Sequence, residues 1–591
     1  MEIQQFGQVF GTVEKQEKRL MDDYKIGKVI GVSGEFIWIS LIDHTNVDGI
    51  EEGVPSTMLI NTHTPIGPTP LLIGQPGTFV SVRVPSGQLL AVITTVDMRE
   101  SIPSQSEIRS AEAEGQAIVE GQKRIISAVP VGILDSGRTF ERGTDVLPTV
   151  NSDACAVLPE TINSIYNQYA EGNFSLGHLS LIPDQQATIN LDAFLSRHSA
   201  ILGQTGGGKS WAVASFLQKI AYFPQATTVL FDLHGEYAAA FGSEADVISG
   251  ADIELPYWLM NSEELLGLMV DRSESAAPNQ IAKFKELLQN AKDQHSENQN
   301  LGLDRITIDT PVYFDFKYII EEFRQLDTDM VPGTNRKPKQ GPLYGQFTRL
   351  LMRVDSRLND RRYDLIFQPK TYTTSASMED LFRKLLGERI EDRRKVVIID
   401  LSPIPFDVRN SMISLILRCL FDFAYWHRRL KGTSYPIAVL ADEAHIYLNE
   451  NDSDAKSSCE SAERIAKEGR KYGISLTVIS QRPREVSATI LSQCNSFLCL
   501  RISNPDDQSY VRNLLPDSVR GITSMFSTLR RGECILLGDS VMMPTRIKID
   551  PPEPAPQSDD TSFYSAWQQE PADLNVTAVL DAWRRQGVPK S

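Results

Sequence analysis

Short hydrophobic runs separated by turn-forming residues characterise the first third of the chain. Residues 25–42 and 78–96 each contain two apolar stretches around a glycine-containing turn, and residues 124–140 continue the pattern. Short strands joined by glycine-rich turns are typical of small barrels and sandwiches. We therefore expect residues 1–174 to form an N-terminal β-barrel followed by a linker.

Near residue 175 the pattern changes to nearly continuous apolar runs that alternate with helical segments. Apolar runs of this kind are typical of parallel strands that are buried on both faces of a sheet. The sequence therefore predicts an α/β fold in which residues 175–243 and 391–550 are the two parts of one core with a mostly parallel sheet. The predicted strands are residues 199–202, 227–233, 396–401, 437–442, 474–480 and 496–502.

Two stretches depart from this alternation. Residues 244–390 are charged and helical in pattern, and we interpret them as a helical insertion in the core. Residues 551–591 begin with a proline-rich stretch and are interpreted as a C-terminal tail.

Several features argue against a membrane or secreted protein. The most apolar long stretch, residues 412–426, is shorter than a membrane span and contains Arg418 and Asp422. Its apolar residues recur at helical spacing, so we expect a buried helix there. The N-terminus lacks the basic and apolar segments of a signal peptide, and the six cysteines contain no Cys-x-x-Cys pair. We therefore expect a cytoplasmic protein with reduced, mostly buried thiols and no membrane anchor.

The formal net charge of −17 restricts how the protein can meet nucleic acid. Non-specific DNA binding comes from neutralising phosphates with lysine and arginine, so an acidic protein is not expected to coat DNA. A basic lining inside a ring is compatible with an acidic exterior.

The string GQTGGGKS matches the phosphate-binding P-loop pattern G-x-x-x-x-G-K-[ST] at every fixed position. An apolar strand precedes it and an amphipathic helix follows, which is the context that the motif requires. Backbone N–H groups surround the phosphates, Lys209 reaches the β- and γ-phosphates, and Ser210 binds Mg²⁺. ATP and Mg²⁺ are the predicted cofactors, and the predicted nucleotide-binding residues are Gly203, Gln204, Thr205, Gly206, Gly207, Gly208, Lys209 and Ser210.

Two further strand ends carry candidate catalytic residues. The run 437–441 is followed by Asp442, which would hold Mg²⁺ through water, and by Glu443, which would polarise the attacking water as a general base. Gln481 follows the run 474–480, at a position suited to sensing the γ-phosphate and orienting water. The sequence contains neither an Asn-Lys-x-Asp guanine motif nor a Leu-Ser-Gly-Gly-Gln signature, so we do not expect a GTPase or an ABC-type ATPase.

Four segments together resemble the HerA branch of the HerA/FtsK motor ATPases: GQTGGGKS, FDLHGEY, ADEAH and RIAKEGRKYGISLTVISQRP. The resemblance covers most of residues 175–550, and the strand-rich N-terminus is similar in placement to the family's barrel. It implies a RecA-like P-loop core that assembles as a homo-hexamer and translocates double-stranded DNA. It also implies a nuclease or sirtuin-like effector as partner, in DNA end processing or antiphage defence.

The same resemblance assigns roles to three more residues. Arg470, at the end of an exposed helix, resembles the arginine that acts in trans on a neighbouring subunit. Arg197 matches a second arginine that the family brings to a neighbour's nucleotide. Asp232, the acid of FDLHGEY, is assigned to the nucleotide site.

Two classes of function remain open at this point. The first is an ATP-driven translocase or helicase on double-stranded DNA. The second is an ATP-gated scaffold that assembles and activates an effector without processive DNA movement. A membrane-associated conjugation-type motor is disfavoured because no span is predicted.

Overall fold

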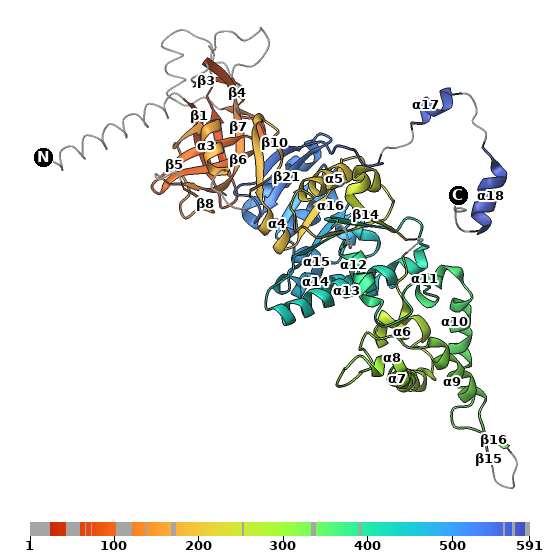
Figure 1. The fold of residues 1–591 in the computed structure, drawn as a ribbon. Helices are drawn as coiled ribbons and strands as arrows, with labels where there is room; N and C mark the ends of the chain where they lie inside the picture. The colour runs from red at the N-terminus through yellow and green to blue at the C-terminus, as the bar shows by residue number, and fades with distance from the viewer. Residues whose placement is uncertain are drawn as a thin grey trace, which may run out of the picture. The chain divides into compact units, whose positions relative to one another are not determined.

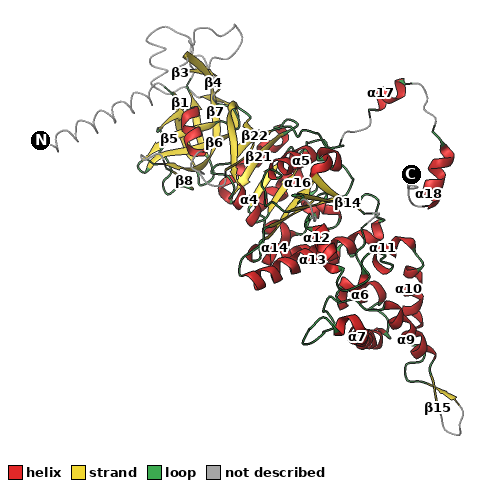
Figure 2. Cartoon of the chain, viewed as in Figure 1, coloured by secondary structure: helices red, strands yellow, loops and turns green. Residues whose placement is uncertain are grey.

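The chain folds into two compact units, which are described separately. The first contains residues 1–216 and 477–552, and the second contains residues 217–476 and 553–591. Figure 1 shows the fold and Figure 2 shows its helices and strands. The computed structural model describes residues 24–42, 59–64, 67–72, 74–101, 121–135, 139–166, 173–250, 253–332, 338–388, 393–558, 562–569 and 574–585.

The first unit begins with the β-barrel that the sequence predicts. Six antiparallel strands follow one another in the order β2-β1-β9-β5-β6-β7, and pairing of β2 with β7 closes the barrel. A short strand, β8, pairs with β7, and β3 with β4 forms a separate hairpin. The strands are β1 (Lys25–Val32), β2 (Ile37–Leu41), β3 (Leu59–Thr64), β4 (Gly67–Leu72), β5 (Phe79–Val84), β6 (Gly87–Ser101), β7 (Gly121–Leu134), β8 (Phe140–Arg142) and β9 (Asp153–Ala156).

Aliphatic side chains fill the barrel interior. Ile26, Val29, Ile37 and Val80 are all fully buried there, as expected when alternate residues of each strand face inward. Gly27 is required by the close approach of β1 and β2, because a Cβ atom at this position would lie 2.4 Å from the carbonyl oxygen of Ser40. The hydrophobic alternation seen in the sequence therefore builds a packed core rather than an open channel.

The α/β part of the first unit surrounds strand β12. This strand lies between β19 and β20 and is parallel to both. Beyond β20 the sheet continues antiparallel through β21, β22, β10 and β11, strands that the sequence pattern did not identify. The strands are β10 (Asn173–Leu179), β11 (Ile182–Asn190), β12 (Ser199–Leu202), β19 (Ile474–Ser480), β20 (Ser496–Cys499), β21 (Glu533–Gly538) and β22 (Thr545–Ile549).

The barrel packs directly on this α/β part through a run of 3₁₀ turns, η10 (Asp517–Thr528). Gly521 of η10 fits against the barrel so closely that a Cβ atom would lie 2.6 Å from the ring of Phe36 and 2.8 Å from Val129. The barrel is thus an integral part of the first unit. The helices of this unit are α3 (Pro159–Tyr166), α4 (Leu191–Ser196), the first part of α5 (Lys209–Ile220), α15 (Ala488–Ser492) and α16 (Pro505–Leu514).

The second unit is built on four parallel strands in the order β18-β13-β17-β14. The sequence predicts three of these strands: β13 (Thr228–Asp232), β17 (Val396–Asp400) and β18 (Ile437–Ala441). The fourth, β14 (Ala245–Ser249), falls within the stretch that the sequence assigned to the helical insertion, so the inserted helices begin later, at α6. Two long helices, α13 (Phe406–Lys431) and α14 (Lys456–Glu468), accompany the strands.

The insertion is helical, as predicted, and Figure 2 shows it as a group of helices with one small hairpin. Lys292 lies fully buried within it, and its Nζ donates to the carbonyl oxygens of Ile308 and Thr310 at 2.7 and 2.8 Å. Burial lowers the pKa of this amine to about 8. The elements are α6 (Ser262–Met269), α7 (Ala277–Gln294), α8 (Ser296–Gln299), α9 (Phe316–Thr328), β15 (Met330–Pro332), β16 (Pro338–Gln340), α10 (Thr348–Leu358), α11 (Asp364–Phe367) and α12 (Met378–Leu385).

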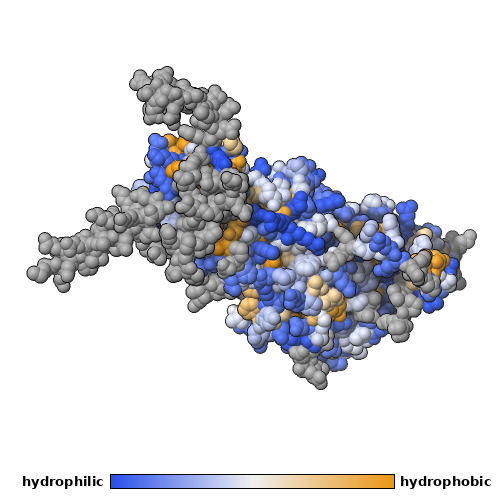
Figure 3. All heavy atoms as spheres, turned by 90° about the horizontal axis from the view of Figure 1, so that it is seen from above, coloured by the Kyte–Doolittle hydropathy of each residue, from blue (hydrophilic) through white to orange (hydrophobic). Residues whose placement is uncertain are grey.

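Two helices, α17 (Phe563–Gln568) and α18 (Val576–Arg585), belong to the C-terminal tail. Hydrophilic residues cover most of the face drawn in Figure 3, with small scattered hydrophobic patches. The stretch 412–426 forms the middle of α13, as predicted, and none of the described helices has the length and apolarity needed to span a bilayer. All six cysteines are buried free thiols.

Candidate nucleotide-binding site

The P-loop lies where the sequence predicts it, between the end of β12 and the first turn of α5. Gly206 and Gly208 have φ angles of +73° and +97°, a region that side chains other than glycine rarely adopt. Lys209 is 8% exposed at the start of α5, where backbone N–H groups and the helix dipole favour an anion. The predicted apolar face of α5 is also confirmed, since Val213 and Phe216 are buried.

Residues from other strands hold the P-loop from the side. Thr205 Oγ1 donates a hydrogen bond to Oε1 of Gln481, at the end of β19. Gln204 accepts a hydrogen bond from the backbone N–H of Ser503 at 3.0 Å through its side chain. Its own backbone N–H donates to the carbonyl oxygen of Arg501 at 2.9 Å. The structure therefore brings Gln481 and the P-loop together, two features that are 276 residues apart in the chain.

A loop that the sequence analysis did not single out also covers the P-loop. Gly532 lies so close that a Cβ atom on Gly208 would be 3.3 Å from its backbone nitrogen. Next to it, Arg531 is exposed and places its guanidinium 5.9 Å from the ring centroid of Trp211, in the first turn of α5. This adds a cation and an aromatic ring to the phosphate-binding loop. No sequence motif marks Arg531, because its placement depends on the fold of η10 and β21.

Arg197 lies in the same unit, just before β12, and is engaged with an acid. Its Nη1 is 2.6 Å from Oδ2 of Asp539, and Asn495 Nδ2 donates to the same oxygen at 3.1 Å. Partial burial raises the pKa of the Asp539 carboxyl, but the hydrogen bonds from Asn495 and Arg197 and the charge of Arg142 outweigh this and hold it below the usual value. Within this unit the Arg197 guanidinium therefore belongs to an ion pair.

In the second unit, β18 ends in the two predicted carboxylates. Asp442 and Glu443 are 3% and 8% exposed. Glu443 has φ 47° and ψ 42°, a left-handed conformation that costs energy for any residue with a side chain, and such strain is concentrated at functional sites. One Glu443 oxygen lies 3.3 Å from Nδ1 of His445. Tyr447 fixes the turn by donating its hydroxyl hydrogen to the Asp442 carbonyl oxygen at 2.8 Å.

The side chain of Asp232, at the end of β13, accepts hydrogen bonds from the loop that follows it. Its Oδ1 accepts hydrogen bonds from the backbone N–H groups of residues 234, 235 and 236, and Oδ2 accepts one from Tyr237. The side chain is fully buried, and this burial raises the pKa of the carboxyl even though the amides act in the opposite direction. The carboxylate shapes the DLHGEY loop and exposes no surface to a ligand in this structure.

Arg470 has a different environment from Arg197. It is exposed in a 3₁₀ turn, η8 (Gly469–Lys471), that directly follows α14. Within the part of the chain that the structure describes, its guanidinium has no hydrogen-bond or ion-pair partner. Its position leaves it free to reach a group outside this chain.

The residues predicted to hold Mg²⁺ have suitable chemistry. Ser210 offers a hydroxyl in the first turn of α5, and Asp442 offers a carboxylate at the end of β18. Oxygen donors of this kind suit Mg²⁺, which keeps several waters and takes one or two protein ligands together with phosphate oxygens. Among the described residues there is no cluster of three or more histidine, cysteine or acidic side chains that would indicate a different, all-protein metal site.

Most of the chain is similar in sequence to known proteins. Residues 174–420 match the family described as "Helicase HerA, central domain". The chain is 25% identical over 504 residues to the DNA double-strand break repair helicase HerA of Saccharolobus solfataricus, covering 83% of this chain and 91% of that protein. It is 26% identical over 447 residues to the protein of the same name from Sulfurisphaera tokodaii, covering 74% and 81%.

Solved structures that align with part of the chain do so with TM-scores below 0.5. VirB4 of Thermoanaerobacter pseudethanolicus aligns with a TM-score of 0.42 and 16% identity over 64% of this chain and 96% of that chain. The plasmid coupling protein TrwB in complex with ADP and Mg²⁺ aligns with a TM-score of 0.37 and 12% identity, over 67% and 92%.

Proposed function

We propose that the chain, which matches the HerA central domain over residues 174–420, hydrolyses ATP to move along double-stranded DNA as a homo-hexameric ring. The relatives that match along most of their length are named as double-strand break repair helicases. The fold class is that of a RecA-like ATPase core carrying an N-terminal barrel and a helical insertion.

The observation that carries this proposal is the P-loop with Gln481 bonded to it. A P-loop binds nucleotide phosphates through its backbone, and Thr205 holds the amide of Gln481 at the tip of β19 beside that loop. A side chain at this place can respond to whether the bound nucleotide has a γ-phosphate. The response would be transmitted to strand β19, which carries Gln481 at its end. Lys209 supplies the positive charge for the β- and γ-phosphates.

Glu443 is proposed as the base that polarises the attacking water. Its backbone is strained, as is common at functional sites, and its side chain is buried at the end of β18. Ser210 and Asp442 would hold Mg²⁺, which supplies neutralisation of phosphate charge when it is bound. The residues of the chain orient the water and accept its proton.

Arg470 is proposed to complete a neighbouring subunit's site in the ring. An exposed arginine with no partner in the described part of its own chain is suited to stabilising transition-state charge across an interface. Arg197 is the second candidate for this role, although it would first have to leave Asp539. In a hexameric ring, each such arginine would lie beside the nucleotide of the next copy.

We further propose that the N-terminal barrel recruits an effector, a nuclease or a sirtuin-like enzyme, in DNA end processing or antiphage defence. Within its described residues the barrel has no P-loop and no cluster of metal-ligating side chains. It packs on η10 and therefore moves with the P-loop unit. A partner bound to the barrel would thus be coupled mechanically to nucleotide turnover.

A second candidate function is an ATP-gated scaffold that assembles and activates the effector without processive movement. The net charge of −17 favours this alternative, because a DNA motor needs cations along its channel. Both functions use the same nucleotide site, so they differ only in how turnover depends on DNA.

Steady-state ATPase of the full chain, with and without linear duplex at two salt concentrations, separates the two functions. A motor contacts phosphates, so duplex should raise its turnover and salt should reduce that stimulation steeply. The same measurement is repeated on the complex with its effector. Turnover that ignores DNA in both preparations would eliminate the motor and leave the scaffold.

A further inference from the structure

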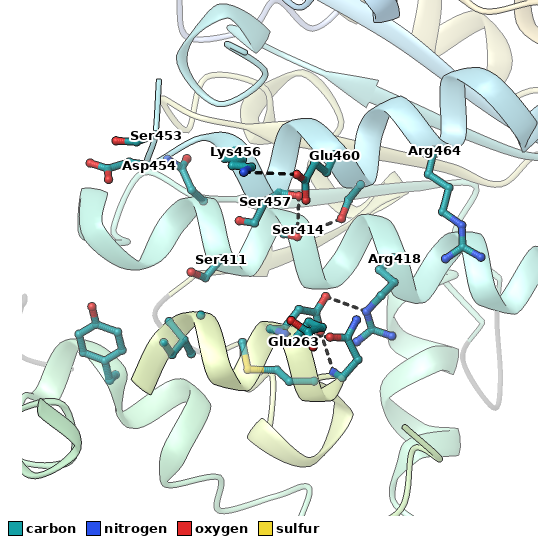
Figure 4. Close-up of a pocket in the computed structure, with 18 of the residues that line it drawn as sticks. Glu263, Ser411, Ser414, Arg418, Ser453, Asp454, Lys456, Ser457, Glu460 and Arg464 are labelled. Atoms are coloured by element: carbon teal, nitrogen blue, oxygen red, sulfur yellow. Dashed lines mark hydrogen bonds and ion pairs between the residues drawn. The ribbon is translucent and has the colours of Figure 1, made fainter. Parts of the chain in front are cut away.

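A large polar pocket lies in the second unit, away from the strand ends that carry Asp442 and Glu443. It has a volume of about 940 Å³ and opens between helix α6 of the insertion and the helices α13 and α14. Figure 4 shows α6 with Glu263 on one side and α14 with Lys456, Glu460 and Arg464 on the other. None of the residues assigned above to nucleotide, metal or catalysis lines it.

Serine side chains line the wall formed by α13 and α14. Ser414 on α13 donates to the carbonyl oxygen of Ser457 on α14 at 2.9 Å, and its hydroxyl lies 3.0 Å from that of Ser461. These contacts fasten the two helices together through small side chains. This wall of the pocket is therefore lined by serine hydroxyl groups, and because serine side chains are small the pocket volume stays open.

The opposite wall, formed by α6, contains a glycine that the backbone conformation of this helix does not require. Gly267 lies inside α6 with an ordinary φ angle, and a Cβ atom there would meet nothing within 4 Å. Glycine in a helix interior costs about 1 kcal/mol relative to alanine. Gly267 is present in spite of this cost, and because it has no side chain the pocket in front of α6 stays wide.

Two buried polar atoms in the pocket lining have no hydrogen-bond partner. Asn410 is 4% exposed and its Oδ1, an acceptor, is unsatisfied. The Nη1 of Arg357, a donor, is also unsatisfied, while the guanidinium is held over the Tyr363 ring at 5.6 Å. An unsatisfied buried polar group costs about 1–3 kcal/mol, so a ligand group that bonds to these two atoms would gain stabilisation there. A backbone amide of a ligand supplies both groups, because its N–H donates to an acceptor such as Asn410 Oδ1 and its C=O accepts from a donor such as Arg357 Nη1.

The charges around the pocket are mostly paired, which argues against a polyphosphate or nucleic acid as the ligand. Arg418 is 2.7 Å from Glu264, and Lys456 is 4.0 Å from Glu460. Arg464 turns away from its own helix to reach Asp422 at 3.5 Å. Charges that are already paired attract a polyanion only weakly. They are compatible with a polypeptide segment that carries both positive and negative side chains.

We propose that this pocket receives an extended polypeptide segment of a partner protein. Backbone amides of the segment satisfy Asn410 and Arg357, and one of its side chains packs against Phe406, which is half exposed at the pocket edge. Recognition of this kind takes affinity from main-chain hydrogen bonds and specificity from a side-chain pocket.

Occupation of the pocket would affect the catalytic strand end through α14. Ser458 of α14 donates to the carbonyl oxygen of Tyr447 at 2.6 Å, and Tyr447 in turn holds the Asp442 carbonyl. The other end of α14 leads into Arg470. A segment that clamps α6 to α14 therefore restrains both a catalytic turn and the candidate trans arginine, and it regulates ATPase turnover.

The test uses the full chain and a library of random 12-residue peptides displayed on phage. The library is selected on the wild-type protein alone, and Gly267→Trp, which fills the pocket, is kept for the binding measurements. Recovered peptides are synthesised and their Kd is measured. We expect binding at least tenfold weaker for Gly267→Trp and for Asn410→Leu. Gly34→Trp, another glycine facing open space but on the barrel, should bind as the wild type does.

Other outcomes overturn the proposal. Peptides that bind Gly267→Trp as well as the wild type, or no enrichment at all, would show that the pocket is not a peptide site. Displacement of the peptide by inorganic phosphate or ADP from a Lys209→Ala protein would identify a small anion as the ligand. Cross-linking of a Gly267→Cys variant to another subunit, specific because the native cysteines are buried, would identify a second copy as occupant. Gly267→Ala should melt at a higher temperature than the wild type, because alanine would replace a helix-interior glycine whose Cβ position is open.

Discussion

Strands β13 and β18 are parallel neighbours, both are buried along their whole length, and each leads into an acidic residue, yet the chain that follows the two strands differs. The carboxylate of Asp232 is enclosed by four backbone N–H groups of its own loop. After β18, the chain instead places Glu443 in a strained left-handed conformation. An apolar strand that ends in an acid therefore does not by itself identify a catalytic residue.

The difference is explained by the residues that follow each acid. Gly235 has φ +72°, which lets the chain after Asp232 fold back so that its amides point at the carboxylate. The ADEAH segment has no glycine, and the left-handed conformation falls on Glu443 itself. The backbone that follows each acid therefore differs, and with it the surroundings of the carboxylate.

The sharpest test of this contrast is Glu443→Gln, for which we expect the largest effect. ATP should still bind, but turnover should fall by roughly 10²–10⁴-fold, because the base that accepts the water proton is lost. Lys209→Ala should act differently and weaken nucleotide binding itself. Steady-state ATPase and a fluorescent-nucleotide Kd measure the two effects. Near-normal turnover of Glu443→Gln would remove this residue from the base role.

The second prediction compares the two candidate trans arginines and begins with Arg470. Arg470→Ala and Lys209→Ala subunits should each be inactive alone, because each ring lacks one half of every site. Mixed rings contain some interfaces with both halves intact, so mixing should restore a fraction of the ATPase. Ring assembly is checked by sizing before activity is compared. A mixture as inactive as its parents, with rings intact, would contradict action in trans.

Much of this architecture follows from local sequence pattern, and the rest depends on distant partners. The bounds of β12 and β19 match the predicted runs 199–202 and 474–480, because such strands are continuous apolar segments. Strand β11, at the edge of the sheet, was missed because it is mostly polar, and its neighbour β10 was missed because glycine and histidine interrupt its apolar residues. The positions of Asp442, Glu443 and the P-loop were found because each belongs to a motif.

Side-chain partners were harder to predict than the motifs. The bond between Arg197 and Asp539 joins residues 342 positions apart, and no local pattern encodes it. The pocket beside α6 depends on how the insertion folds back on α14, and the cation–π contact between Arg464 and Phe421, at 4.2 Å, is part of that packing. The sequence therefore predicts which residues bear chemistry better than which residues they contact.

The third prediction concerns the other side of the strand comparison, Asp232. In Asp232→Asn, one carboxylate oxygen becomes an N–H₂ group, so at least one loop amide loses its acceptor and meets a donor. The cost should be about 1–3 kcal/mol, seen as a lower melting temperature with ATP affinity nearly unchanged. Differential scanning calorimetry and nucleotide binding are measured on the same preparation. An unchanged melting temperature with weakened ATP binding would instead place Asp232 in the nucleotide site.

The smallest expected effect is at Arg197, where the ion pair with Asp539 is partly exposed on both sides. Exposed ion pairs contribute about 0–1 kcal/mol, and Asn495 still satisfies the carboxylate, so Arg197→Ala should barely change the melting temperature. Arg142→Ala is the matched control, because Arg142 also lies beside Asp539, at 3.4 Å, and has no assigned role. If Arg197 serves a neighbour's nucleotide, its loss should reduce ATPase while loss of Arg142 does not. Equal, near-normal ATPase in both variants would leave Arg197 as a structural ion pair and Arg470 as the remaining trans candidate.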